Sequence, residues 1–226
     1  MLKGLKRIDT GKESELVYNI IKSGGLTIVP NNVGYGFNCH SGESIRKTYN
    51  LKGRQLDNRC VCIVDLEIFK EMADCSDEER TLVEEVSRRY PICFVTPYNK
   101  ESAFLTKLDM FALTQVTKRG TIALFLNLGE LEEKIVGIGK KDKLLIIGSS
   151  ANISHTGNKF TVDEIEPEIR KGVDYIVDGG IVPYHNPTRM AGTIIDLKTL
   201  TPVRRGILFR EIIGAINYLK HGKIVY

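Results

Sequence analysis

Apolar residues follow two different spacings along this chain, and the two alternate. Short runs rich in apolar residues, typical of buried strands, lie at residues 26–29, 59–64, 92–96, 121–126 and 143–148. Between these runs the apolar residues recur at helical spacing, which predicts helices at residues 11–23, 42–51, 65–73, 76–89, 129–136 and 161–171. Strands that alternate with helices favour an α/β fold.

The C-terminal part completes this pattern with three short strands, at residues 174–178, 192–197 and 201–204, and a last helix at about 208–220. Residues 97–120 are the least legible segment and fit a hairpin, a lid or an insertion. A chain of 226 residues suits one domain, although two small ones are possible. We therefore expect residues 1–226 to form a single domain with its core at about 10–210.

Composition and charge exclude some classes of protein. Apolar residues make up 42% and charged residues 27% of the chain, an ordinary globular balance. No apolar run approaches the ~18–20 residues that span a bilayer, and the basic start lacks the apolar core of a signal peptide. We expect a cytoplasmic protein without membrane contact. The net charge of +4 permits a phosphate-bearing ligand or RNA.

Cysteine and histidine spacing predicts no metal site. The five cysteines include no CxxC pair, in which two residues separate the cysteines, and the four histidines have no metal-ligand spacing. Buried, reduced thiols are the expected state of the cysteines.

Four segments carry polar residues suited to binding chemistry. The first, residues 30–37, places two glycines around Tyr35 after a strand, where the backbone can approach a ligand closely. The second holds Lys52 and Arg54, whose two cations can converge on a polyphosphate. The third, residues 149–154, puts small hydroxyl and amide groups at the end of a strand, where open α/β sheets bind ligands. The fourth is the tail, residues 191–206, with Thr193 and Arg204.

Taken in order, these segments resemble the YrdC-like threonylcarbamoyladenylate synthases. The family signatures are Pro-Thr-Glu-Thr-x-Tyr-Gly-Leu, Lys-x-Arg, Thr/Ser-Ser-Ala-Asn-x-Ser, and Ser-Thr-x-x-Asp followed by Arg-x-Gly. The matching positions here are residues 30–37, Lys52 with Arg54, residues 149–154, and residues 192–196 followed by Arg204 and Gly206. The resemblance covers about residues 10–210.

The resemblance implies a twisted open mixed sheet with flanking helices and a basic concave groove. It also implies that threonine, bicarbonate and ATP give threonylcarbamoyl-AMP and pyrophosphate, with Mg²⁺ carried on the triphosphate. The product would feed threonylcarbamoyladenosine formation on tRNA, so tRNA and tRNA-modification proteins are implied partners.

The site residues follow from the same resemblance, position by position. Lys52 and Arg54 are expected to contact phosphate and carbamate as the catalytic pair. The residues expected to hold the nucleotide are Ser149, Ser150, Asn152, Thr193 and Arg204. The residues expected beside the amino acid are Asn31, Val33 and Tyr35.

Four departures make this a divergent member. Residues 89–93 stand where the family has Gly-Pro-x-Thr before the strand at 92–96. Residues 31–33 read Asn-Asn-Val where the family has Thr-Glu-Thr, which is expected to change the amine that binds. Phe125 begins the triplet that replaces the family's Arg-x-Pro, so a phosphate-binding cation is missing there. Gly192 stands in place of a serine.

Three hypotheses stay open at this point. The chain is a working synthase with a divergent pocket, or a relative that serves another amine or a carbamoyl transfer in a specialised pathway. The third hypothesis is a non-catalytic module that binds RNA or a nucleotide.

Overall fold

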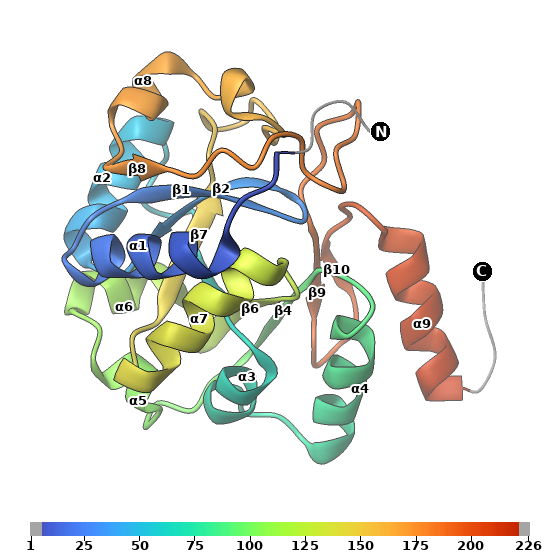
Figure 1. Cartoon of the computed structure of the whole chain (residues 1–226). Coiled ribbons are helices and arrows are strands. Elements are labelled where there is room, and N and C mark those ends of the chain that lie inside the picture. Colours follow the sequence, from blue (N-terminus) through green and yellow to red (C-terminus); the bar gives the residue numbers. More distant parts are fainter. Residues whose placement is uncertain (1–5, 222–226) are drawn as a thin grey trace.

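The computed structural model describes residues 6–221, and within that range the strands form one mixed sheet (Figure 1). The strands are β1 (Thr27–Asn31), β2 (Gly34–Cys39), β3 (Val61–Ile63), β4 (Ile92–Pro97), β5 (Thr117–Lys118), β6 (Thr121–Leu126), β7 (Ile146–Ser150), β8 (Tyr175–Ile176), β9 (Thr193–Asp196) and β10 (Pro202–Arg204). Their order is β10-β9-β4-β6-β3-β7-β2-β1-β8, and β5 pairs with β6. Most of the basic start, residues 1–5, lies outside the described range.

Helices flank this sheet, as the sequence pattern predicts. They are α1 (Thr10–Lys22), α2 (Gly42–Lys52), α3 (Leu66–Met72), α4 (Asp77–Ser87), α5 (Ala103–Thr106), α6 (Met110–Val116), α7 (Glu130–Asp142), the 3₁₀ turn η1 (Val162–Glu164), α8 (Pro167–Lys171) and α9 (Phe209–His221). Figure 1 shows α1 and α7 side by side, and α4 beside α9. None of the helices within residues 6–221 is long and apolar enough to cross a bilayer. The expected α/β class, a mixed sheet with flanking helices, is confirmed.

Strand β2 is the main element that the sequence pattern misses. The two glycines around Tyr35 predict a turn after the strand that ends at Pro30, but Gly34 and Gly36 lie in a strand that pairs antiparallel with β1. The turn is only two residues long, since Asn31 pairs directly with Gly34. The Val33 N–H donates to the Asn31 side-chain oxygen at 3.0 Å, an Asx turn that closes the hairpin.

Helix α7 and the following strand also differ from the prediction. We expected α7 to end at residue 136, but it continues to Asp142 through two glycines, and it ends where Lys143 adopts φ 55. Gly139 is required there, because a Cβ would lie 2.8 Å from the Leu144 carbonyl oxygen. Strand β7 consequently starts at Ile146 and includes residues 149 and 150, which we expected to follow the strand.

Two further segments resolve into shorter elements than expected. The helix predicted at residues 161–171 divides into η1 and α8, because Pro167 lacks an N–H and starts a new helix. Residues 97–120 form α5, α6 and the β5–β6 hairpin. This segment packs against the start of α2, where the Gly42 N–H donates to the Asp109 carboxylate at 2.6 Å.

Tyr35 joins the sheet to the loop after β8. Its side chain is only 1% exposed, and its hydroxyl donates to the Gly180 carbonyl oxygen at 2.7 Å. The Gly179 N–H donates to the same hydroxyl at 3.1 Å. Burial raises the pKa of Tyr35 to about 12, so the hydroxyl keeps its proton at physiological pH. This link positions residues 179–180 against the β1–β2 hairpin.

We predict that Tyr35→Phe lowers the free energy of unfolding by about 1–3 kcal/mol, because it leaves a buried N–H and a buried carbonyl unpaired. Urea denaturation measures this loss. The matched control is Tyr175→Phe, whose hydroxyl donates to Glu13 at 3.0 Å in a half-buried position, and there we expect a smaller loss. Equal losses for the two variants would contradict the structural role of Tyr35.

Candidate functional site

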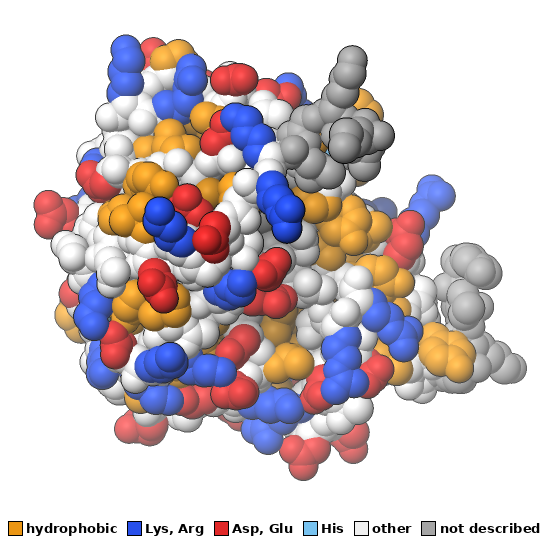
Figure 2. Space-filling view, in the orientation of Figure 1, with side chains coloured by type: hydrophobic (Ala, Val, Ile, Leu, Met, Phe, Trp, Pro, Cys, Tyr) orange, Lys and Arg blue, Asp and Glu red, His pale blue; other side chains and the backbone are white. Residues whose placement is uncertain are grey.

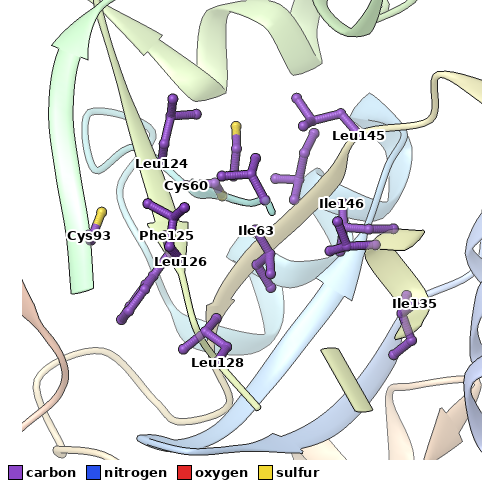
Figure 3. Close-up of a cluster of buried hydrophobic side chains, with 14 of the residues drawn as sticks. Cys60, Ile63, Cys93, Leu124, Phe125, Leu126, Leu128, Ile135, Leu145 and Ile146 are labelled. Carbon is purple, nitrogen blue, oxygen red and sulfur yellow. The ribbon is translucent and has the colours of Figure 1, made fainter. Parts of the chain in front are cut away.

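A pocket of about 210 Å³ lies beside the β1–β2 hairpin, β7 and the segment that leads into β9. The strand register places Asn38, Gly148 and Val61 in one row across β2, β7 and β3, and all three line the pocket. One part of its wall is cationic and hydroxylic, formed by Arg54, Arg59, Arg204, Ser149 and Ser150. Another part is apolar, formed by Val61, Ile63, Phe125, Leu128 and Ile194. Figure 3 shows buried side chains of this region, among them Ile63 of β3, Phe125 of β6 and Leu128 in the loop after β6.

Arg54 reaches the pocket because α2 ends two residues before it, at Lys52. Gly53 closes the helix with φ 56, a left-handed conformation that turns the chain toward β7. The Arg54 guanidinium then donates to the Ser149 hydroxyl at 2.7 Å and to the carbonyl oxygens of Asn58 at 3.1 Å and Arg59 at 2.5 Å. Three hydrogen bonds therefore hold this cation in place at the pocket wall.

Lys52 lies behind the pocket and does not line it. Its side chain is 2% exposed, and its ammonium group donates to the carbonyl oxygens of Ser150 and Asn152, the latter at 2.8 Å. It also donates to the Asn152 side-chain oxygen at 3.2 Å. Burial, together with the nearby Arg54 charge, lowers the pKa of Lys52 to about 7. Lys52 thus holds the turn after β7 against the end of α2 through its ammonium group.

Asn152 and Thr193 are also buried behind the pocket. Asn152 is 5% exposed, and its amide donates to the Ile153 carbonyl at 2.6 Å while its oxygen accepts from Lys52. The Thr193 hydroxyl donates to the Ile207 carbonyl at 2.7 Å and accepts from the Gly206 N–H at 3.2 Å. Both side chains fix the chain around the site, and neither lines the cavity.

Arg204 faces the same cavity from the opposite end of the chain. Its Nε donates to the Gly192 carbonyl at 2.9 Å. Desolvation lowers the pKa of Arg204, and the nearby charge of Arg54 lowers it further. Among the described residues, no Asp or Glu lines the pocket. Guanidinium groups that face one cavity without a carboxylate favour an anionic ligand. Figure 2 shows acidic and basic side chains interspersed over the face that carries α1 and α7.

The predicted amino-acid contacts all border the pocket. Asn31, Val33 and Tyr35 line it, although the Tyr35 hydroxyl is engaged by the loop at 179–180. The neighbouring Asn32 points elsewhere. Its N–H donates to the Leu128 carbonyl at 2.7 Å, and its side chain donates to the Asn127 carbonyl at 3.2 Å, which fastens the hairpin tip to the loop before α7.

Comparison with known proteins shows the family of this chain. The profile of the Sua5/YciO/YrdC family, described as "Telomere recombination", matches residues 19–206. The chain belongs to this family.

Relatives within the family are distant in sequence. A putative threonylcarbamoyl-AMP synthase of Methanocaldococcus jannaschii is 23% identical over 202 residues, which cover 87% of each chain. The P. abyssi Sua5 structure complexed with L-threonine has a TM-score of 0.72 at 20% identity, and the match covers 93% of this chain and 59% of Sua5. E. coli YciO has a TM-score of 0.70 at 17% identity, with 90% and 93% covered. The chain thus spans about three fifths of the Sua5 structure.

Two of the departures from the family signatures lie in contact with each other. Phe125 stands where the signature has an arginine, and Gly192 stands where it has a serine. A Cβ at position 192 would lie 2.4 Å from the Cζ atom of Phe125, so the phenyl ring occupies the space of that side chain. Phe125 therefore leaves no room for the serine side chain of the signature at position 192.

Sequence reasoning missed two buried polar residues beside the pocket. Asn38 is fully buried in β2, and Glu132 is 1% exposed in the first turn of α7. The Asn38 amide donates to the Glu132 carboxyl at 2.7 Å. Burial raises the pKa of Glu132 to about 7, and the amides of Asn38 and Asn31 partly oppose this rise. The sequence could have indicated this residue, because Glu132 shares the apolar face of helix α7 with Leu131 and Ile135.

We predict that the stability of the protein depends on pH through Glu132. The pKa of this carboxyl rises from 4.5 to about 7 on folding, so the folded state binds the proton more tightly and stability falls as pH rises through this window. Glu132→Gln removes this loss. The variant should match the wild type at pH 5 and exceed its free energy of unfolding at pH 8 by about 3 kcal/mol, by urea denaturation.

The matched control is Glu133→Gln, the exposed neighbour on the same helix. This variant should show no pH-dependent difference from the wild type. A constant difference between Glu132→Gln and the wild type from pH 5 to pH 8 would contradict the raised pKa.

Proposed function

We propose that this chain is a threonylcarbamoyl-AMP synthase-like enzyme that forms a carbamoyl-adenylate from ATP, bicarbonate and an amino acid. One observation carries the proposal. Arg54 and Arg204, which are 150 positions apart in the sequence, face the same pocket beside the Ser149 hydroxyl. Such a cluster suits the phosphates of a nucleotide, whose charge it would neutralise.

The chemistry needs no nucleophile from the protein. The amine of the amino acid combines with bicarbonate and loses water to give a carbamate. A carbamate oxygen then attacks the α-phosphorus of ATP, the new O–P bond forms, and the bond to the β-phosphate oxygen breaks to release pyrophosphate. The protein would hold the two reactants in line and stabilise the charge on the phosphorane oxygens. Mg²⁺ would enter bound to the triphosphate.

The structure suggests a division of labour among the predicted site residues. Arg54 and Arg204 would contact the phosphates directly, with the hydroxyls of Ser149 and Ser150 beside them. Lys52, Asn152 and Thr193 would act as positioning residues, because all three hydrogen-bond the backbone behind the pocket. Asn31, Val33 and Tyr35 would border the amino acid.

The comparisons support the proposal at the level of the family. One relative is named a putative threonylcarbamoyl-AMP synthase, and the Sua5 structure was obtained with L-threonine. On this basis the product would serve threonylcarbamoyladenosine formation on tRNA, and tRNA or a tRNA-modification protein would be the partner that receives it.

We predict that pyrophosphate release from ATP requires both bicarbonate and an amino acid. The assay follows labelled pyrophosphate with each component omitted in turn, and with a panel of amino acids that includes threonine. Release that needs neither component, or ATP binding without release for every amino acid, would contradict the proposed enzyme. The second result would instead favour a nucleotide-binding module without catalysis.

We further predict that Arg54→Ala and Lys52→Met both weaken binding of a non-hydrolysable ATP analogue, but differ in stability. Arg54→Ala removes a direct contact and should cost on the order of tenfold or more in affinity. Lys52→Met leaves the buried carbonyl oxygens of Ser150 and Asn152 unpaired, so it should also lower the free energy of unfolding by about 2–3 kcal/mol.

Calorimetry measures the affinity and urea denaturation measures the stability. Lys47→Met is the matched control, since Lys47 also lies on α2 but pairs at the surface with Asp174. Unchanged affinity for the analogue in both site variants would contradict the assigned phosphate site.

A further inference from the structure

Arg59 is a cation of the pocket wall that lies outside the four segments predicted to carry binding chemistry. It follows the loop at residues 55–58, two positions before β3, and it lines the same pocket as Arg54 and Arg204. Among the described residues no carboxylate lines this pocket, and none forms an ion pair with these three arginines. The pocket therefore holds three guanidinium charges without a counter-charge, one more than the proposed function uses.

Arg59 and Arg54 are neighbours on this wall. The Arg54 guanidinium closes the loop at 55–58 by donating to the carbonyl oxygen of Arg59 at 2.5 Å, and it lies 5.5 Å from the centre of the Tyr49 ring. The Arg59 Nη1 and the Tyr49 hydroxyl donate to the same Gln115 side-chain oxygen, at 3.3 and 3.0 Å. Burial raises the pKa of Tyr49, and the charges of Arg54 and Arg59 both oppose this rise. Both guanidinium groups thus lie next to Tyr49.

Arg54 lies between the other two cations. On one side it contacts Arg59, and on the other its charge adds to the effect of desolvation in lowering the pKa of Arg204. The Ser149 hydroxyl, which accepts from Arg54 at 2.7 Å, marks the middle of this row. The order of the cations along the pocket wall is therefore Arg204, Arg54 and Arg59.

Arg59 keeps donors that the protein does not use. Arg54 donates from all three of its guanidinium nitrogens. Arg59 donates only from Nη1, to the Leu56 carbonyl oxygen at 3.2 Å and to Gln115. Its Nε is buried without a hydrogen-bond partner, and its Nη2 forms no hydrogen bond within residues 6–221. Because a guanidinium carries five N–H donors, Arg59 can bind an anion through Nη2 and keep both of its contacts with the protein.

The position of Arg59 also bears on the cation that the family signature has and this chain lacks. Phe125 lines the pocket where the signature has an arginine, and its ring fills the space beside Gly192. Arg59 comes just before β3, the strand that pairs in parallel with the β6 strand of Phe125. The same pocket has thus lost one cation at the end of β6 and holds another before β3.

We propose that Arg59 supplies the third cation of a polyphosphate site, in place of the arginine that Phe125 replaces. This inference rests on the proposed function, in which a nucleoside triphosphate binds in the pocket. Three consecutive phosphates lie along Arg204, Arg54 and Arg59, and the Arg59 Nη2 donates to an oxygen of the phosphate at its end of the row. Arg54, in the middle, contacts any two adjacent phosphates that are bound.

Calorimetric titration of the full chain with inorganic tripolyphosphate and with pyrophosphate tests this row. Arg59→Gln removes the charge at one end, so it should weaken binding of tripolyphosphate and of a non-hydrolysable ATP analogue by about tenfold or more. Pyrophosphate can still occupy Arg204 and Arg54, so its affinity should change by less than about threefold. Arg54→Ala removes the middle of the row and should weaken binding of both inorganic probes by about tenfold or more.

Arg46→Gln is the matched control for the loss of one positive charge. Arg46 lies on α2 with its guanidinium 3.5 Å from the centre of the Phe111 ring, and it does not line the pocket. This variant should leave the affinity for both probes unchanged. The ratio of the tripolyphosphate and pyrophosphate affinities is the readout for Arg59, because a general loss of structure would weaken both probes together.

The possible outcomes separate this inference from the proposed function. Unchanged affinity for tripolyphosphate and the ATP analogue in Arg59→Gln, with weaker binding in Arg54→Ala, would overturn the role of Arg59 and leave the proposed function standing. An equal loss for tripolyphosphate and pyrophosphate in Arg59→Gln would overturn its place at the end of the row. A wild-type chain that binds neither tripolyphosphate nor the ATP analogue would overturn the proposed function and, with it, the inference.

Discussion

The buried ammonium group of Lys52 connects the two halves of the site. It joins the last residue of α2 to the turn after β7 through the carbonyl oxygens of Ser150 and Asn152. These residues are about a hundred positions apart, and a backbone hydrogen bond from the Ser154 N–H to the Lys52 carbonyl at 2.9 Å joins the same two segments. Because Gly53 ends the helix immediately afterwards, the same contact determines where Arg54 meets Ser149. The phosphate site that we propose depends on this geometry.

A buried cation with a pKa of about 7 is expensive to keep unless it is well solvated by the protein. Here carbonyl and amide oxygens replace water around the ammonium group. This arrangement gives Lys52 a structural role, whereas the guanidinium groups of Arg54 and Arg204 line the pocket. The Lys-x-Arg pair of the family signature thus divides into one residue that builds the site and one that lines it.

The sequence was sufficient to predict the α/β class and the convergence of Lys52 and Arg54 with residues 149–152. Both follow from apolar periodicity and from motifs kept in order along the chain. It could not show that Lys52, Asn152 and Thr193 lie behind the pocket. A polar residue in a motif has the same sequence pattern whether its side chain binds a ligand or a backbone carbonyl. The strand β2 was missed for a related reason, since its glycines are typical of turns and only pairing with β1 and β7 makes them a strand.

The departures from the family signatures become consistent in three dimensions. Phe125 fills the space next to Gly192, and Asn32 fastens the hairpin tip to the loop before α7. Asn31 and Asn38 border the pocket, and the Asn38 amide donates to the buried Glu132 carboxyl behind it. These contacts connect positions that are distant in sequence, so single motifs do not reveal them.

A crystal structure of the full chain with a non-hydrolysable ATP analogue tests the central claim most directly. The account predicts phosphate oxygens within hydrogen-bond distance of the Arg54 and Arg204 guanidinium groups and of the Ser149 hydroxyl, with the Lys52 ammonium still bound to the turn at 150–152. A nucleotide bound with its phosphates away from both arginines, or with Lys52 released from that turn, would contradict it.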